Sequence, residues 1–148
     1  MKFKAVVAAA MLVAMGAGAV VAADEPQEVR QQMMKRVGGA MGAMAGIAKG
    51  EKPYDAEVVR TALTTIDEVS KTFPDYFPAG SDTGFETEAS PKIWENMDDF
   101  KAKAAALGKE AETILASLPA DQAGVGAAIG PLGKTCGACH ELYRLKKN

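Results

Sequence analysis

Residues 90–119 read SPKIWENMDDFKAKAAALGKEAETILASLP, and this stretch decides the fold. Its apolar residues recur in alternating steps of four and three: Ile93, Met97, Phe100, Ala104, Leu107, Ala111 and Ile114. An average spacing of about 3.5 residues is typical of a helix that packs along the seam of a left-handed bundle. Ser90 and Pro91 suit the start of a helix, and Pro119 suits its end. The stretch therefore predicts one long helix of a helical bundle.

Three further helices are predicted from apolar periodicity on either side of this stretch. They cover about Pro26–Lys49, about Asp55–Lys71, and Asp121 to the C-terminus, where Pro131 either bends or interrupts the last one. A long loop over Thr72–Ser90 contains prolines, glycines and aromatic residues, and it is either a packed connector or a functional loop. No run alternates apolar and polar residues between turn signals, so no sheet is expected. The predicted fold class is all-α, an antiparallel four-helix bundle.

Three glycines lie four residues apart in the first predicted helix: Gly38, Gly42 and Gly46. Each costs roughly 1 kcal/mol of helix stability relative to alanine, so a stripe of them on one face needs a reason. Glycines allow a neighbouring backbone to approach closely. The neighbour is either another helix of the same domain or a second copy of the chain, which would make a homodimer through the first helix.

Residues 1–23 have the composition of a secretory signal peptide. Lys2 and Lys4 precede an uncharged run over 5–21, and Val21-Ala22-Ala23 offers small residues for a cleavage site. The alternative, a permanent membrane anchor, is disfavoured because about 20 apolar residues are usual for a membrane span. The sequence therefore predicts a cleaved leader, one domain over 24–148, export to the periplasm, and no stable membrane anchor after processing.

The charge balance argues against a nucleic-acid partner. The whole chain holds 17 Lys and Arg against 19 Asp and Glu, a formal net charge of −2, and loss of the leader removes two lysines and no acid. A mildly acidic domain lacks the basic surface with which proteins neutralise phosphates. The only two cysteines lie three residues apart, so a disulfide scaffold is also excluded.

The sequence Cys136-Gly137-Ala138-Cys139-His140 is the C-x-x-C-H pattern of covalent haem c attachment. On a helix, Cys136 and Cys139 lie on the same face, so both thiols can form thioethers with one porphyrin. His140, the only histidine of the chain, can then bind the iron axially. A thioredoxin-like redox pair would need a βαβ unit, and a structural zinc site would need about four ligands. One haem c, covalently bound through two thioethers in the C-terminal helix, is therefore predicted.

The position of the motif limits the second axial ligand of the iron. The motif ends eight residues before the C-terminus, so this ligand has to come from upstream. Because there is no second histidine, methionine is the usual remaining ligand. The first predicted helix offers four: Met33, Met34, Met41 and Met44. Methionine also fills apolar cores, and three of the four are expected to do only that.

With these features the chain resembles the class II cytochromes c, which comprise the cytochromes c′ and their low-spin relatives of the cytochrome c-556 type. The resemblance covers essentially the whole chain after the leader. It is carried by Arg30-Gln31 and Met34-Lys35, by Gly50-Glu51-Lys52-Pro53-Tyr54-Asp55, by Pro91-Lys92-Ile93-Trp94, and by Cys136 to His140 followed by Tyr143-Arg144. It implies the same four-helix bundle that the periodicity predicts.

The resemblance also implies roles for individual residues. Arg30 and Gln31 match first-helix residues that contact the haem and its propionates, and an arginine suits a carboxylate partner. Thr87 and Glu88 match a loop that touches the haem edge. Met34 matches the position where cytochromes c′ place an apolar side chain over an open iron face, and where the low-spin relatives place a methionine ligand.

Two functions follow as expectations, and they differ in the role of Met34. If Met34 and His140 both bind the iron, the protein is a low-spin electron carrier that serves redox proteins of the periplasm. If Met34 does not bind, the iron is five-coordinate, and the protein binds nitric oxide or carbon monoxide. An enzyme such as a peroxidase would need a distal histidine, which the chain lacks, so no enzymatic activity is expected.

Overall fold

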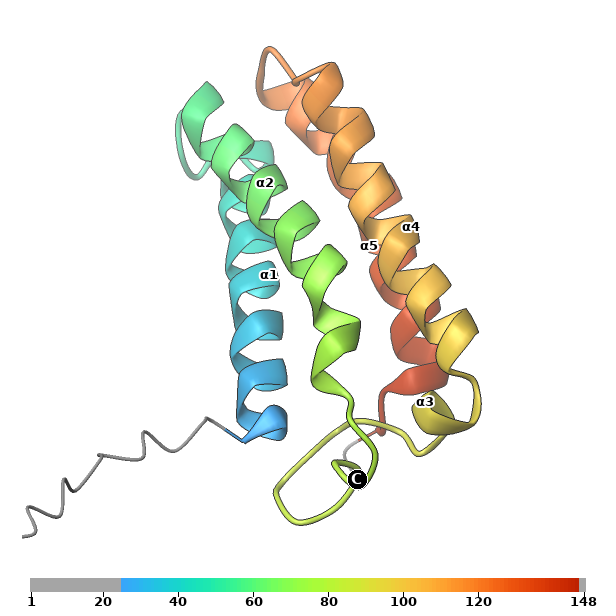
Figure 1. The fold of residues 1–148 in the computed structure, drawn as a ribbon. Helices are drawn as coiled ribbons and strands as arrows, with labels where there is room; N and C mark the ends of the chain where they lie inside the picture. The colour runs from blue at the N-terminus through green and yellow to red at the C-terminus, as the bar shows by residue number, and fades with distance from the viewer. Residues whose placement is uncertain (1–24, 147–148) are drawn as a thin grey trace, which may run out of the picture.

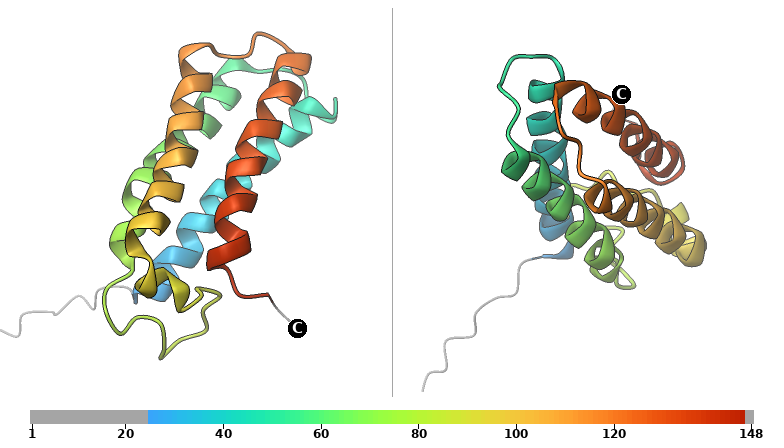
Figure 2. Two further views of the ribbon diagram at one scale, coloured as in Figure 1. Left: turned by 90° about the vertical axis from the view of Figure 1, so that its right-hand side faces the viewer. Right: turned by 90° about the horizontal axis from the view of Figure 1, so that it is seen from above.

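Four long helices form an antiparallel bundle in the computed structural model, which describes residues 25–146 (Figure 1). They are α1 (Pro26–Ala48), α2 (Ala56–Thr72), α4 (Met97–Ala116) and α5 (Gln122–Tyr143). Successive long helices run in opposite directions, and α1 and α4 each pack against both α2 and α5 (Figure 2). The predicted all-α four-helix bundle is confirmed. The predicted leader, residues 1–23, lies outside the described residues.

All four long helices contribute side chains to one apolar interior. The apolar face predicted for α2 is buried throughout, at Val59, Ala62, Leu63, Ile66 and Val69. The seam predicted for α4 is buried at Phe100, Ala104 and Ala111. Removing a large aliphatic or aromatic side chain from water contributes roughly 1.5–3 kcal/mol, so these stripes account for how the helices face one another.

Aspartate side chains fix where α2 and α5 begin. Asp55 accepts hydrogen bonds from the backbone N–H groups of Glu57 and Val58 at 2.8 and 3.3 Å. Asp121 accepts one from the backbone N–H of Gly124 at 2.8 Å. Because the first N–H groups of a helix have no partner inside it, each such cap contributes about 1 kcal/mol. Both positions agree with the helix starts predicted from the sequence.

The prediction of one unbroken helix after Ser90 is wrong, because the helix breaks at Asn96. The break separates the short helix α3 (Lys92–Glu95) from α4. Asn96 has φ −134° and ψ 50°, and its Nδ2 donates to the backbone oxygen of Lys92 at 3.4 Å. Asparagine side chains compete in this way for backbone hydrogen bonds and favour non-helical conformations. As a result, α3 lies across the end of the bundle (Figure 1).

The predicted loop over Thr72–Ser90 begins with a 3-10 helix, η1 (Phe73–Tyr76), which the loop prediction misses. The ring of Phe77, which follows η1, lies 4.7 Å from that of Phe100 between centroids. Both belong to a second group of buried apolar residues, the end cluster, which consists of Phe77, Ile93, Phe100 and Tyr143. The first part of the loop is therefore a packed connector.

The last helix continues through Pro131 without interruption but ends at Tyr143, short of the predicted C-terminal end. Arg144 is extended, with φ −110° and ψ 126°, and forms an antiparallel bridge with Ala89. The backbone N–H of Ser90 donates to the backbone oxygen of Tyr143 at 2.9 Å. The chain leaves the helix here because it pairs with the end of the long loop instead.

Candidate haem-binding site

The two cysteines and the histidine of the C-x-x-C-H motif lie near the end of α5. Cys136 and Cys139 are half-buried free thiols, and Cys139 packs against the end cluster. Burial raises the pKa of both thiols. Burial, together with the positive charge of Arg144, lowers the pKa of His140 and favours the neutral imidazole that binds metals. Two thiols one helical turn apart and a neutral imidazole suit attachment of a haem and axial ligation of its iron.

The antiparallel register of α1 and α5 brings Met34 and His140 to the same level. Toward the other end of this helix pair, a methyl group built on Gly126 of α5 would lie 3.9 Å from Cβ of Ala48 on α1. Because seven residues make close to two helical turns, steps of seven from this point keep close to one stripe of each helix. Two such steps, about 21 Å at about 1.5 Å per residue, lead to Met34 on α1 and to His140 on α5.

α1 and α5 diverge toward the N-terminus of α1 and the C-terminus of α5 (Figures 1 and 2). A methyl group built on Gly133 or Gly137, which lie on either side of Cys136 in the chain, would meet no neighbouring atom within 4 Å. Two thiols one helical turn apart, with open surroundings along α5, fit a haem attached through Cys136 and Cys139.

The four methionines of α1 fall into two groups. Met33 and Met44 are buried in the bundle interior, whereas Met34 and Met41 are half-buried at its edge. Met33 and Met44 therefore act as core residues. Met34 and Met41 are the two whose sulfur atoms can reach beyond the core, and Met34 is the one level with His140.

Arg30 points into the long loop and is only 4% exposed. Its Nη2 donates to the backbone oxygen of Ser81 at 2.8 Å, and its Nη1 donates to Ser81 Oγ at 3.1 Å and to the backbone oxygen of Tyr76 at 3.3 Å. The guanidinium carbon lies 4.5 Å from the ring centroid of Phe77 and 5.7 Å from that of Trp94. Arg30 thus holds the loop against α1, and the predicted contact with a haem propionate would be additional to these bonds.

Replacing Arg30 with methionine is expected to destabilise the protein by about 2–4 kcal/mol, because the buried oxygen of Ser81 loses its donor and two rings lose a cation. Chemical denaturation followed by circular dichroism measures the free energy of unfolding. The matched control is Arg36→Met, at an exposed position of α1, for which a change within about 0.5 kcal/mol is expected. Equal losses in both variants would contradict the role of Arg30 in holding the loop.

Two glutamines of α1 hold the same loop. Gln31 Nε2 donates to the backbone oxygen of Glu86 at 2.8 Å, and Gln27 Nε2 donates to that of Thr83 at 2.8 Å. Gln27 is buried, and its Oε1 has no hydrogen-bond partner among the described residues. Sequence patterns do not single out Gln27, since its partner lies 56 residues away. The N-terminal half of α1 therefore holds the loop in place, and it also carries Met34 of the candidate site.

Thr87 and Glu88 lie where the long loop returns to α5. Glu88 Oε2 accepts a hydrogen bond from Nε of Arg144 at 2.6 Å, and its charge acts on His140 in the opposite sense to that of Arg144. Thr87 Oγ1 accepts a hydrogen bond from the backbone N–H of Ala89 at 3.1 Å. The structure thus brings Glu88 and Arg144 near the imidazole, whereas the bond of Thr87 is local to the loop.

The sequence of residues 25–144 matches the family model described as cytochrome C′. The chain belongs to the cytochrome c′ family. A cytochrome c-556 from Agrobacterium fabrum is 56% identical to it over 147 residues, which cover 99% of each chain. Another from Agrobacterium tumefaciens is 63% identical over 120 residues, or 81% of this chain and 97% of that one. The solved structure of cytochrome c′ from Rhodopseudomonas palustris is 35% identical, with a TM-score of 0.79 over 85% of this chain and 100% of that one.

Proteins of this family carry a covalently bound c-type haem and are periplasmic. The predicted family and the predicted cofactor, haem c, are therefore confirmed for this cytochrome. It is a haem electron carrier in the broad sense that covers the whole family. Whether the iron has a second axial ligand distinguishes an electron carrier from a protein that binds nitric oxide or carbon monoxide.

Proposed function

We propose that this cytochrome is a periplasmic electron carrier whose haem iron is held by His140 on one face and by Met34 on the other. The register of α1 and α5 carries the proposal, since it leads from the contact between Ala48 and Gly126 to both ligands at one level. Methionine ligation raises the reduction potential of a haem. The relatives at 56% and 63% identity are both named cytochrome c-556 rather than cytochrome c′, which also supports the proposal.

In this arrangement the chain supplies ligands and surroundings and performs no acid–base step. A haem held by these residues would supply one-electron chemistry, and the chain would form and break no covalent bond of its own. Arg30, Gln31, Thr87 and Glu88 are proposed as contacts around the haem. No enzymatic activity is proposed, because the only imidazole of the chain serves as an axial ligand.

The absorption spectrum of the purified holoprotein tests the ligation. Sharp low-spin bands in the ferrous protein, with the far-red charge-transfer band of a methionine–iron bond in the ferric protein, are the expected result. Broad high-spin spectra that shift when carbon monoxide is added would overturn ligation by Met34.

A five-coordinate protein that binds nitric oxide or carbon monoxide is the second candidate. One observation favours it: Met34 packs against the apolar interior, so its side chain has a stable position without the iron. Apolar surroundings over an open iron face would admit small uncharged molecules and disfavour charged ones. The same spectra separate the two candidates.

Export by a cleaved leader is proposed from the composition of residues 1–23. None of the helices within residues 25–146 is long and apolar enough to cross a bilayer. Periplasmic protein that begins near Asp24, by N-terminal sequencing, is the expected result. Unprocessed protein in the membrane fraction would favour an anchor instead. Redox proteins of the periplasm are the proposed partners.

A homodimer through α1 is also proposed, because packing inside the domain explains only part of the glycine stripe. A methyl group built on Gly46 would lie 3.6 Å from the side chain of Lys52. A methyl group on Gly38 or Gly42 would meet no neighbouring atom within 4 Å. Gly42 therefore has no partner in the described part of the chain that would explain its small size.

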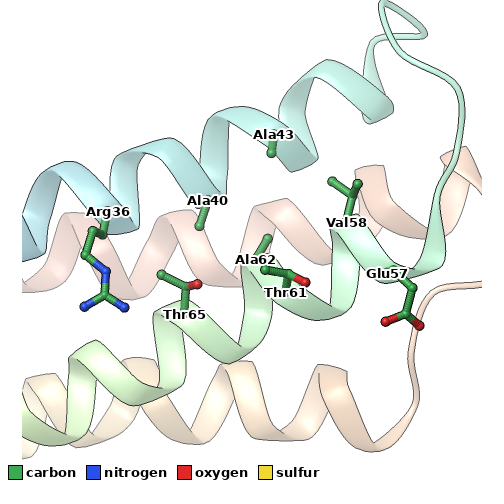
Figure 3. Close-up of a pocket in the computed structure, with 8 residues that line it drawn as sticks. All are labelled: Arg36, Ala40, Ala43, Glu57, Val58, Thr61, Ala62 and Thr65. Atoms are coloured by element: carbon green, nitrogen blue, oxygen red, sulfur yellow. The ribbon is translucent and has the colours of Figure 1, made fainter.

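An open groove of about 510 Å³ lies between α1 and α2, on another side of α1 from Gly38 and Gly42, so it is not part of the proposed dimer surface (Figure 3). Small side chains line much of it, among them Ala40, Ala43 and Ala62. Gly42→Glu is expected to shift sedimentation of the holoprotein from dimer to monomer, since it puts a charged side chain into the close helix contact proposed for the glycine stripe. The control is Ala102→Glu, at an exposed position of α4. Monomeric wild-type protein would contradict the dimer.

A further inference from the structure

Asp99, in the first turn of α4, is held between two side chains at the haem-bearing end of the bundle. Its Oδ2 accepts a hydrogen bond from the hydroxyl of Tyr143 at 2.6 Å and lies 3.8 Å from Nζ of Lys103. Tyr143 follows His140 by three residues on α5. The hydrogen bond therefore ties a carboxylate of α4 to the helix that carries the C-x-x-C-H motif.

Tyr143 has little freedom to move, so it fixes the position of its acceptor. The residue is 6% exposed, and its ring stands edge-on to that of Phe100 with 5.4 Å between centroids. Its backbone oxygen accepts the hydrogen bond from Ser90. The hydrogen bond to Asp99 raises the pKa of Tyr143 to about 12, so the hydroxyl is a neutral donor at physiological pH.

Tyr143 links Asp99 to the surroundings of Cys139. This cysteine packs against the end cluster, of which Tyr143 is a member, and the hydroxyl of Tyr143 holds Asp99, which in turn lies beside Lys103. Charges held next to this cluster also act on a haem attached through Cys139. The side chains of Lys103 and Asp99 are 25% and 54% exposed, so solvent weakens the effect without removing it.

We propose that Asp99, positioned by Tyr143, lowers the reduction potential of the haem on Cys139, and that Lys103 opposes it. One electron passes from a reductant, a redox protein in the cell or a mediator dye in the experiment, to the ferric iron, and no bond or proton of the chain changes. By Coulomb's law the added negative charge is disfavoured beside a carboxylate and favoured beside an ammonium group. The inference rests on the proposed electron-carrier function but not on ligation by Met34.

Spectroelectrochemical titration of the holoprotein tests the two charges. Asp99→Asn keeps an acceptor for Tyr143, and it is expected to raise the ratio of ferrous to ferric protein about threefold at fixed potential, or about 28 mV at 59 mV per tenfold. Lys103→Gln is expected to lower the ratio by a similar factor. The matched controls, Asp98→Asn and Lys101→Gln, remove the same charges from the same helix at exposed positions and are expected to change the ratio less.

A double-mutant cycle tests the positioning role of Tyr143. In a Tyr143→Phe background, Asp99→Asn is expected to change the ratio less, because the released carboxylate moves into solvent. An Asp99→Asn effect no larger than that of Asp98→Asn overturns the role of the charge, and an undiminished effect in the Tyr143→Phe background overturns the positioning.

The wild-type spectra and the potential shifts of the variants separate the role of Asp99 from ligation by Met34. If the Asp99→Asn variant does not retain haem, the comparison of Lys103→Gln with Lys101→Gln decides. Equal shifts of the reduction potential in these two variants would overturn the proposal. Low-spin wild-type spectra with no specific potential shift would leave the carrier intact and remove only the role of Asp99. High-spin wild-type spectra with the expected potential shifts would contradict ligation by Met34 and leave the role of Asp99 intact.

Discussion

A Cys136→Ala, Cys139→Ala double variant is expected to lose covalent haem completely. The two thiols lie one helical turn apart on α5, and they are the only cysteines of the chain. His140 remains in this variant and can still bind free haem, so an absorption spectrum alone does not decide the matter. The decisive measurement is the haem that stays with the denatured polypeptide, by haem staining of a gel and by intact mass.

Ala138→Ser is the matched control for the double variant. It changes an exposed residue between the two thiols and is expected to retain full covalent haem. Each single variant keeps one thiol, so a reduced yield with one thioether is expected. Covalent haem in the denatured double variant would mean that another side chain forms the bond.

The features that the sequence predicts correctly are those fixed by local chemistry. Asp55 caps the helix that follows it, so the start of α2 is encoded within four residues. The apolar stripe from Val59 to Val69 has helical spacing, and the hydrophobic effect alone decides which side of α2 it faces. The C-x-x-C-H motif is local as well, because one helical turn sets the distance between its thiols.

The features that the sequence misses depend on contacts between distant segments. α5 ends at Tyr143 because the following residues bond to the loop, as where the backbone N–H of Leu145 donates to the oxygen of Glu88 at 2.7 Å. The partner of Arg30 in that loop, Ser81, lies 51 residues away. Neither contact leaves a periodic signal. The proposed pairing of Met34 with His140 comes from the family resemblance and not from periodicity, because the relative level of the two residues depends on how α1 and α5 pack.

Replacing Met34 with alanine is expected to convert essentially all of the haem from low-spin to high-spin. The substitution removes the only half-buried sulfur of α1 level with His140, since the neighbouring Met33 is buried in the interior, and a methyl group cannot bind iron. The far-red charge-transfer band of the ferric protein is expected to disappear, and the ferrous protein is expected to bind carbon monoxide readily. The reduction potential is expected to fall, because methionine ligation raises it.

Met41→Ala is the matched control, and it tests the proposed register of α1 and α5. Met41 is half-buried like Met34 and lies seven residues along the same stripe of α1, closer to the contact between Ala48 and Gly126. Both variants lose a similar amount of packing, so a loss of stability alone affects them alike. Only Met34→Ala is expected to change the spin state. Conversion by Met41→Ala would place the iron two helical turns further along α1. A wild-type protein that is already high-spin and that neither variant changes would have a five-coordinate iron, and a low-spin protein that neither variant changes would have another ligand.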